Sequence, residues 1–561
     1  MDMDRLSALI RKAVYHLPTR IQLRLKAAKR TILGTYDWAG PVRRLRLREQ
    51  SDIQATVRRH SGTDGRRRIA IFSLHHFSPV EYGLAKALEL RGHDVQGLLC
   101  DGLLPLCELN LGPTVRPPCP VCIGALSRHE DAFGFEYSRA SQFISRRDLE
   151  LAEALVNNTP DEELSALRVD NVPVGTFARR ELQRYHRGFV FDPERDPAYR
   201  RWLVSGVLYT WLSDRWLTKV QPDTLGVCSG RTLNTACVYE VARQRGIHVV
   251  TWDGTATHAD TLMFSHDRPA TEVPLDDIWP TEEHRRLSNV ETGTLATFLN
   301  LWARSKNTPF PYNTTPVSAP EAIHAELELR FGAPLIVAYT NTSWDIAVID
   351  RDVGFGSMFD WLFELVDYAR RNPDIDLVIR AHPAEKMVPR ALQSRTPVGK
   401  EIRARFRPLP ANIRIVEGDN PISSYTLAEM AQVNILYASR FGLELALRGI
   451  RPWIAGAVTY RGKGFTLDLE SADHMTGLLD TTSSNQRLTE TEIELAQRFA
   501  YLWFFRYEVR LPLLHPADKR FVLNSFRELA PGGDQTIDKL CDAIVTGKRF
   551  VDISTPSPGD A

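Results

Sequence analysis

Two stretches of the chain decide the fold: Asp376-Leu-Val-Ile-Arg-Ala-His-Pro-Ala-Glu385 and Val433-Asn-Ile-Leu-Tyr-Ala-Ser-Arg-Phe-Gly-Leu-Glu444. Each is a short apolar run that ends in a polar turn containing Gly or Pro, and helical sequence lies between the two. This alternation predicts parallel strands joined by helices. Because open α/β sheets bind ligands at the carboxyl ends of their strands, the polar residues of these turns are candidate ligand contacts.

The chemistry of the two turns favours a phosphorylated ligand. The turn at Ser439 opens a helix and offers free backbone N–H groups to an anion. Gly442 allows the backbone to approach a phosphate, and Glu444 is placed to accept hydrogen bonds from ribose hydroxyls. His382, held by Pro383, is in reach of a phosphate or a base. The alternative is an ordinary α/β domain with a capping serine and a structural histidine.

The ordered set of residues in this region resembles the C-terminal half of capsule polysaccharide biosynthesis proteins. These are GT-B glycosyltransferases that include the β-Kdo transferases, with relatives among bacterial sialyltransferases. The resemblance implies two Rossmann-like domains that face a cleft, with a catalytic His382 and a nucleotide-sugar donor in the second domain; CMP-Kdo or another CMP-sugar is the leading donor. The residues that it assigns to donor binding are Arg380, Pro383, Glu385, Ser439, Arg440, Gly442 and Glu444.

An acidic residue in the first half of the chain is the candidate base. The strand predicted at 247–251 ends in Trp252-Asp253-Gly254, which resembles the end of the acidic motif of bacterial sialyltransferases, although Trp252 replaces its first acidic residue. There the carboxylate deprotonates the acceptor hydroxyl, a role that suits an Asp at the end of a strand. The alternative is that Asp253 only caps its turn. The resemblance also points to substrate contacts, namely Arg231, Gly254, Asn341 and Asp345.

Length and composition are those of a globular protein with two or more domains: 561 residues, 43% hydrophobic and 25% charged. The net charge of +1 gives no general case for a nucleic-acid partner. No run of eighteen apolar residues or secretory leader is evident, and the odd cysteine count favours a reducing compartment, so we expect a cytoplasmic protein.

The expected domain order starts with a basic, helical extension over residues 1–65. A Rossmann-like acceptor domain (66–306), a linker (307–330), a Rossmann-like donor domain (331–487) and C-terminal helices with a tail (488–561) follow. The first predicted βα turn has no Gly-x-Gly-x-x-Gly, which argues against NAD.

The N-terminal region is strongly basic. Residues 1–68 contain seventeen Lys or Arg and six Asp or Glu, a net charge of +11, and residues 6–17 have the spacing of an amphipathic helix. Such a segment either lies on an anionic membrane surface, here the inner face of the plasma membrane, or packs on the body of the protein.

Four cysteines in the first half of the chain are candidate metal ligands. Cys119-Pro-Val-Cys122 has the spacing of a zinc knuckle, and Cys100 and Cys107 precede it. Two interpretations of these cysteines are left by the sequence: ligands of a structural zinc, or buried free thiols. A redox pair would have to open a helix, which the preceding Pro117-Pro118 does not suggest.

These observations predict a metal-independent GT-B glycosyltransferase of surface or capsular polysaccharide biosynthesis, which needs no cofactor for catalysis because no Asp-x-Asp motif stands out. Its partners would be a nucleotide sugar, a glycan or lipid-linked acceptor, the membrane surface and the polysaccharide assembly machinery. The alternatives are a sugar-nucleotide epimerase, a glycerophosphotransferase-like enzyme, and a non-catalytic assembly or export partner.

Overall fold

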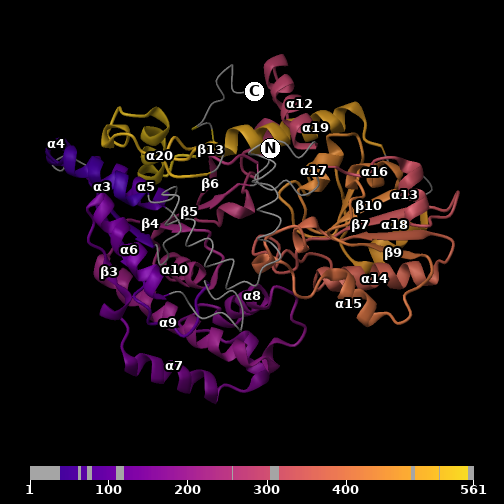
Figure 1. Cartoon of the computed structure of the whole chain (residues 1–561), viewed down its shortest axis with the longest axis horizontal. Coiled ribbons are helices and arrows are strands. Elements are labelled where there is room, and N and C mark those ends of the chain that lie inside the picture. The colour runs from indigo at the N-terminus through magenta and orange to yellow at the C-terminus, as the bar shows by residue number, and fades with distance from the viewer. Residues whose placement is uncertain are drawn as a thin grey trace, which may run out of the picture.

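The computed structural model describes residues 38–60, 65–72, 79–108, 119–255, 257–303, 315–481, 487–516, 519–551 and 553. The helix expected over residues 6–17 lies outside this part of the chain. The described residues form two α/β domains, each built on its own sheet (Figure 1). The predicted fold class, with two Rossmann-like domains, is confirmed.

The first domain contains a seven-stranded sheet in the order β13-β6-β5-β4-β1-β2-β3. Strands β1 to β5 are parallel neighbours, whereas β6 and β13 add an antiparallel edge that the sequence pattern did not predict. The strands of this sheet are β1 (Arg68–Phe72), β2 (Asp94–Leu99), β3 (Ser138–Arg139), β4 (Thr224–Cys228), β5 (His248–Gly254), β6 (Thr261–His266) and β13 (Glu508–Arg510).

A long apolar helix, α9 (Pro197–Val220), forms the core on one side of this sheet. Asp196 caps its N-terminus by accepting the Ala198 N–H at 2.8 Å, and Pro197 occupies its first turn. Trp202 and Trp216 are almost fully buried, so this stretch belongs to the core. The other helices of the domain are α5 (Pro79–Leu90), α6 (Cys119–Phe133), α7 (Arg146–Asn158), α8 (Val174–His186) and α10 (Leu233–Gln244).

The second domain contains a six-stranded, fully parallel sheet in the order β12-β11-β10-β7-β8-β9. The strand order reverses between β7 and β10, which is where such sheets bind ligands. The elements of this domain are β7 (Leu335–Tyr339), α14 (Met358–Arg371), β8 (Asp376–Arg380), α15 (Val398–Arg405), β9 (Ile413–Val416), α16 (Ser424–Met430), β10 (Val433–Leu436), α17 (Phe441–Ala446), β11 (Pro452–Ile454), β12 (Leu467–Asp468) and α18 (Ala472–Thr481).

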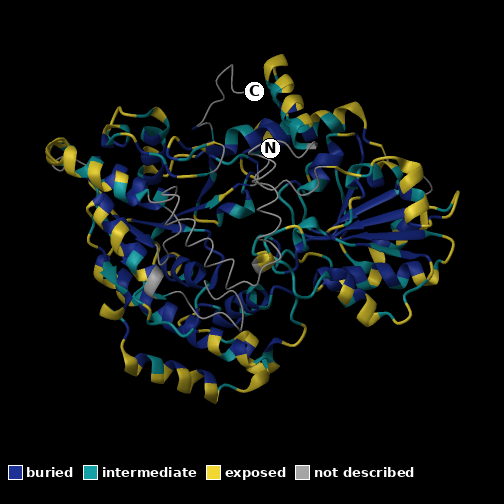
Figure 2. Cartoon of the chain, in the orientation of Figure 1, coloured by how far each residue is buried: buried dark blue, intermediate teal, exposed yellow. Residues whose placement is uncertain are grey.

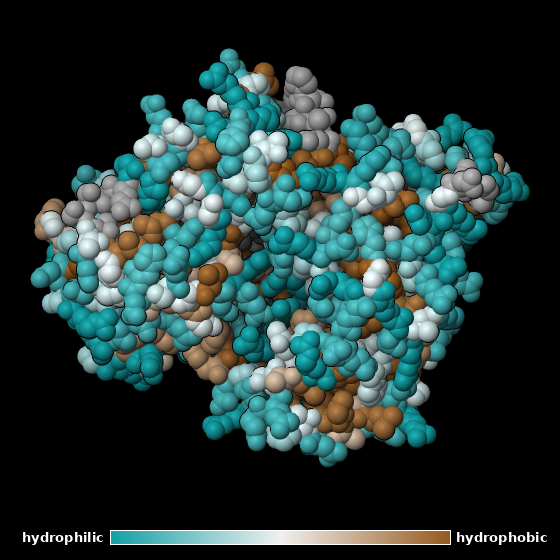
Figure 3. Space-filling model, turned by 180° about the vertical axis from the view of Figure 1, so that it is seen from behind, coloured by the Kyte–Doolittle hydropathy of each residue, from teal (hydrophilic) through white to brown (hydrophobic). Residues whose placement is uncertain are grey.

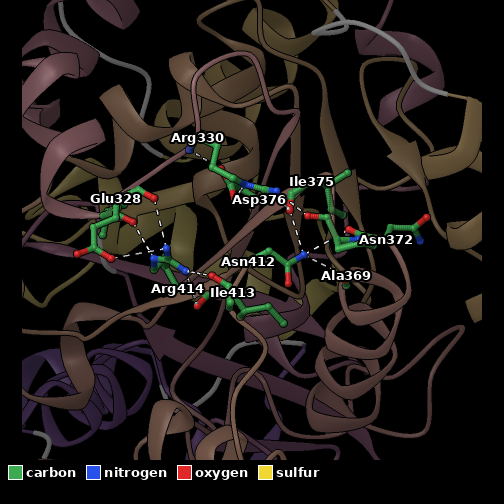
Figure 4. Close-up of polar contacts among 12 residues, drawn as sticks. Glu328, Arg330, Ala369, Asn372, Ile375, Asp376, Asn412, Ile413 and Arg414 are labelled. Atoms are coloured by element: carbon green, nitrogen blue, oxygen red, sulfur yellow. Dashed lines mark hydrogen bonds and ion pairs between the residues drawn. The ribbon is translucent and has the colours of Figure 1, made fainter.

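A polar network closes the amino end of this second sheet (Figure 4). The Asn412 amide donates to the carbonyls of Ala369, Asn372 and Ile375 at 2.8, 3.3 and 3.0 Å, and so satisfies the last turn of α14. Arg330 binds Asp376 through its backbone N–H and its Nε, at 2.8 and 3.0 Å. Because open α/β sheets bind ligands at the opposite, carboxyl end of their strands, we expect this network to stabilise the fold.

The chain returns to the first domain after the second. Helix α19 (Glu490–Tyr501) leads through a π-helical turn (Leu502–Tyr507) to β13, and α20 (Gln535–Thr546) then lies beside α5 (Figure 1). The Arg91 guanidinium donates to the Leu529 carbonyl at 2.7 Å. The sequence predicted mostly helix over residues 488–545, so the strand β13 is a correction: Val509 is fully buried and completes the sheet edge beside β6.

Two basic helices precede the first sheet, α3 (Ala39–Arg48) and α4 (Gln50–His60). Helix α3 packs against α6, whereas α4 has no buried residue and projects at one end of the molecule (Figure 2). The face shown in Figure 3 is mostly hydrophilic, with apolar residues in separate patches. Among the described helices, none combines the length and the apolar character needed to cross a bilayer.

Candidate functional site

The carboxyl ends of strands from both domains meet where the domains touch. We call this region the interdomain junction: Ser229–Arg231 after β4, Asp253 in β5, Thr257, the loop 340–350 after β7, His382 after β8, and Ser439–Arg440 after β10. Arg231 reaches the loop of the second domain, and Arg440 reaches Thr257 of the first. The structure therefore brings together most of the residues that the sequence singled out.

Asp253 lies at the end of β5 with its carboxyl group enclosed by protein. Burial is the main cause that raises its pKa to about 6. The Gly254 N–H, 2.7 Å from Oδ1, and the nearby Ser229 hydroxyl favour the ionised form, while the negative charge of Asp345 opposes it. Asp253 is thus a carboxyl group that is ionised at neutral pH but more basic than an ordinary aspartate.

Ser229 has a backbone conformation that few side chains adopt. Its φ is +63°, in the left-handed region, and its N–H donates to the Trp252 carbonyl at 2.7 Å. The strained turn holds Ser229 beside Asp253.

The loop after β7 contributes Asn341 and Asp345. The Asn341 amide exchanges two hydrogen bonds with the backbone of Ala438, at 3.1 and 3.0 Å, so it joins the two turns at the strand-order reversal instead of facing a substrate. Asp345 is exposed to water at the junction, yet the protein around it raises the pKa of its carboxyl group. Asp345 lies close enough to Asp253 for its negative charge to raise the pKa of the Asp253 carboxyl group.

His382 is a neutral imidazole in this structure. Its Nδ1 accepts the Ala384 N–H at 3.1 Å, because Pro383 starts a 3-10 turn (Pro383–Glu385) that His382 caps. Burial, and secondarily Arg380, lower the pKa of the ring to about 4. The proton of the neutral ring is consequently on Nε2, which makes His382 a hydrogen-bond donor without charge.

Two predicted donor contacts are corrected by the structure. Arg380 is 3% exposed, and its guanidinium donates to the carbonyls of Glu417, Asn420 and Ile422, at 2.6, 3.2 and 3.4 Å. It supports the loop that follows β9. Glu385 has no exposed surface, and its Oε1 accepts the Val398 N–H at 3.1 Å. Both side chains are buried and bonded to protein groups, so they are not presented to a ligand at the junction.

The burial of Glu385 makes the stability of the protein depend on pH. Burial chiefly raises its pKa to about 8, well above that of an unfolded glutamate, so the folded state prefers the protonated acid. The stabilising contribution of this acid is complete below about pH 4.5 and is lost as the pH rises to about 8. Denaturant titrations at several pH values should show Glu385→Gln gaining roughly 2–5 kcal/mol relative to wild type across that window. A difference that does not change with pH would contradict this assignment.

The turn between β10 and α17 is held by its own residues. The Ser439 Oγ accepts the Phe441 N–H at 3.2 Å. The Arg440 guanidinium stacks on Trp302 with a distance of 3.9 Å to the ring centroid, and its Nη1 donates to the Thr257 hydroxyl at 3.4 Å. Glu444 accepts the Tyr425 hydroxyl and is 8% exposed. Arg440 thus links the predicted donor turn to the first domain through both Thr257 and Trp302.

Gly442 is required by packing. A Cβ at this position would lie 3.1 Å from Cζ of Tyr460 and 3.2 Å from Cδ1 of Ile454, and closer still to the Tyr460 hydroxyl. Gly442→Ala should therefore destabilise the protein by about 1–3 kcal/mol, and by less in a Tyr460→Phe background. Gly477→Ala is the control, since nothing lies within 4 Å of its Cβ. Thermal denaturation of the four variants tests this; equal losses with and without the Tyr460 hydroxyl would contradict it.

The cysteines are free thiols in the structure. Cys119 and Cys122 lie in the first turn of α6, which corrects the expectation that this pair does not open a helix. The Cys100 thiolate is disfavoured by burial, which raises its pKa to about 11. Within the described ranges no three His, Cys, Asp or Glu side chains are grouped as a metal site, and the structural zinc stays a prediction.

Two features of the site had no signal in the sequence. Lys519, from the returning C-terminal segment, donates to the Thr255 carbonyl at 3.2 Å and has its pKa lowered by burial despite the nearby Asp253. A cavity of about 270 Å³ lies between α12 (Asn289–Ala303) and α17, next to Glu444. Both depend on contacts between segments far apart in the sequence.

Comparisons with known proteins show similarity in structure alone. No protein-family model and no curated protein sequence matches the chain. Among solved structures, it is similar to KpsC of Thermosulfurimonas dismutans, a β-Kdo 2,7 transferase, with 15% identity, 55% of this chain and 84% of that chain covered, and a TM-score of 0.31. A β-Kdo 2,4 transferase KpsC of the same organism has 12% identity, with 57% of this chain and 86% of that chain covered and a TM-score of 0.31. UDP-GlcNAc 2-epimerase of Methanocaldococcus jannaschii has 8% identity, with 77% of this chain and 98% of that chain covered and a TM-score of 0.25. These values assign no activity to the chain.

Proposed function

We propose that the chain is a GT-B glycosyltransferase of surface polysaccharide biosynthesis. It transfers a sugar from a nucleotide-activated donor to a hydroxyl group of a glycan or glycolipid acceptor. The observation that carries the proposal is Asp253, a carboxyl group with a raised pKa at the interdomain junction, to which a turn that the resemblance assigns to the donor also contributes. A carboxylate of this basicity suits the removal of a hydroxyl proton.

The proposed reaction forms one bond and breaks one. The acceptor oxygen attacks the anomeric carbon of the donor sugar, and its proton passes to Asp253. The bond between that carbon and the phosphate oxygen breaks, and the nucleotide leaves with the electron pair. The Nε2–H of neutral His382 would stabilise the charge that develops on the phosphate. Asp345 would contact the acceptor or the sugar.

We propose a CMP-activated sugar, with CMP-Kdo first, as the donor; the support is the resemblance of the His382-Pro383 and Ser439–Glu444 motifs. The test is a thermal-shift panel of CMP, UDP, GDP and CDP-glycerol on wild type and His382→Ala. Stabilisation by CMP that the variant loses supports this donor. Stabilisation by another nucleotide replaces it, and CDP-glycerol would favour the glycerophosphotransferase-like alternative. No shift with any nucleotide, in protein shown to be folded, would favour a non-catalytic assembly or export partner.

A sugar-nucleotide epimerase is the second candidate, because Asp253 and Asp345 supply two carboxyl groups with raised pKa values at one junction. Such a pair suits the removal and return of a proton on a single substrate. Incubation with a nucleotide sugar alone distinguishes the two. Conversion without an acceptor supports the epimerase, whereas turnover that depends on an added glycan supports the transferase.

We also propose that the protein binds the inner face of the plasma membrane, where a lipid-linked acceptor and the assembly machinery would be found. Arg58 and Arg59 are exposed on α4, and they continue the basic segment that precedes it. Sedimentation with vesicles should show binding to anionic lipid that falls with salt, and little binding to neutral lipid. Arg58→Glu/Arg59→Glu should weaken it; binding that is equal on both vesicle types would contradict an electrostatic surface.

A further inference from the structure

The loop that bears Asp345 forms a short, defined turn. The Asp345 carbonyl accepts the N–H groups of Val348 and Ile349 at 2.9 and 3.0 Å, and its carboxylate accepts the Ala347 N–H at 3.0 Å. These bonds fix Asp345 relative to the turn. They do not fix the turn relative to the first domain, where Asp253 lies.

Arg231 of the first domain makes that connection. Its Nε donates to the Ile346 carbonyl at 3.0 Å, and its Nη2 donates to the Ile349 carbonyl at 2.6 Å. Its Nη1 lies 3.3 Å from Oε1 of Glu272, a carboxylate of the first domain. One planar guanidinium therefore holds the two carbonyls that flank the turn of Asp345, a geometry that the single ammonium group of a lysine does not reproduce.

A second set of contacts anchors the end of the same loop. Asp350 pairs with Arg179, at 3.0 Å between Oδ1 and Nη2, and with Arg180, both on α8 of the first domain. Arg351 donates to the Ala347 carbonyl at 3.1 Å and to the Thr271 carbonyl of the first domain at 3.2 Å. The first domain thus binds this loop of the second domain at several successive residues.

We propose that Arg231 is a positioning residue, which binds the turn of Asp345 across the interdomain junction and so sets the Asp345 carboxylate opposite Asp253. This corrects the expectation that Arg231 contacts substrate, since the side chain is 5% exposed and three of its nitrogens are engaged with protein groups. The inference rests on the proposed function for its catalytic consequence, but the positioning itself is independent of it.

The geometry has a consequence for the proposed base. Asp253 and Asp345 belong to different domains, so their separation depends on how the loop is held. Loss of the Arg231 contacts should let the loop move away, admit water to Asp253 and remove the neighbouring negative charge. Both changes bring Asp253 closer to an ordinary aspartate.

The experiment compares wild type with Arg231→Ala, Arg231→Lys and Asp345→Asn. Arg215→Ala is the matched control, because it removes an ion pair with Asp148 (2.7 Å) on a different part of the first domain. Hydrogen–deuterium exchange of residues 341–350 reports the position of the loop without any substrate. The pH dependence of kcat/KM reports Asp253. Arg231→Lys serves also as the second variant if Arg231→Ala does not fold.

For Arg231→Ala we expect faster hydrogen–deuterium exchange of the loop and unchanged exchange of the second sheet. We also expect a 10- to 100-fold loss of kcat/KM, and the fall of kcat/KM on the acid side of its pH profile, the acid limb, should move to lower pH. Arg231→Lys should be intermediate, and Asp345→Asn should displace the limb without loosening the loop. Unchanged exchange and an unchanged limb in Arg231→Ala would overturn the proposal. Faster exchange in a protein whose wild type turns over no donor would uphold the positioning role and refute the proposed function instead.

Discussion

Asp253→Asn should lower the rate of sugar transfer by roughly 10²–10⁴-fold, the range expected when a general base is lost. The substituted amide has the shape of the carboxyl group and can still accept the Gly254 N–H, so the fold and the binding of the donor should change little. The loss should therefore be found in kcat, with the thermal shift produced by the nucleotide retained. Steady-state kinetics and the thermal-shift assay together test this.

The pH dependence gives an independent check on the same residue. In the proposed mechanism transfer requires ionised Asp253, and burial raises the pKa of its carboxyl group to about 6, so kcat/KM of wild type should fall about tenfold per pH unit below pH 6. Asp253→Asn should lack this limb. Asp276→Asn is the control, because Asp276 is an exposed carboxylate of the first domain that pairs with Lys463 at 2.6 Å. An Asp253→Asn variant that transfers at nearly the wild-type rate would remove Asp253 from the mechanism.

His382→Ala should cost about 10²–10³-fold in kcat, the usual effect of removing a preorganised donor to a developing anion. The ring is neutral, with its pKa lowered to about 4, so this contribution should be constant between pH 5 and 8. A rate that rose as His382 became protonated would indicate a cationic role and contradict the assignment.

A second substitution separates the structural and the chemical parts of His382. The ring also caps the turn at Pro383 by accepting the Ala384 N–H. Asparagine is a good capping residue, so His382→Asn should keep the melting temperature near that of wild type while losing the Nε2–H donor. We expect it to be as slow as His382→Ala but more stable. Full activity in the asparagine variant would limit the role of His382 to capping.

The sequence predicted local structure well where apolar runs and turn residues agreed. The strands Asp376–Arg380 and Val433–Leu436 lie within the two apolar runs that the pattern assigned to strands, because their burial and their end signals point the same way. The edge strands β6 and β13 were not predicted. They pair with each other across more than two hundred residues, and no local pattern encodes such a pairing.

The positions of Arg380 and Glu385 show why a sequence motif alone does not define a candidate site. Arg380 and Glu385 flank His382 in the sequence, yet both are buried and serve the neighbouring loop and helix. A motif gives the order of residues along a strand and its turn. It does not say which side chain faces solvent and which faces the protein, since that depends on what packs against the turn.

By itself, the sequence determined the α/β class, the two domains and the set of turns at which strands end, because hydrophobic periodicity and Gly or Pro punctuation are local properties. Only the tertiary structure decided which of those turns meet. The electrostatic surroundings that set the pKa of Asp253 and the hydrogen bonds of Arg231 to the turn of Asp345 arise from atoms of distant segments. Desolvation and hydrogen-bond geometry depend on three-dimensional surroundings, and these exist only once the two domains are in contact.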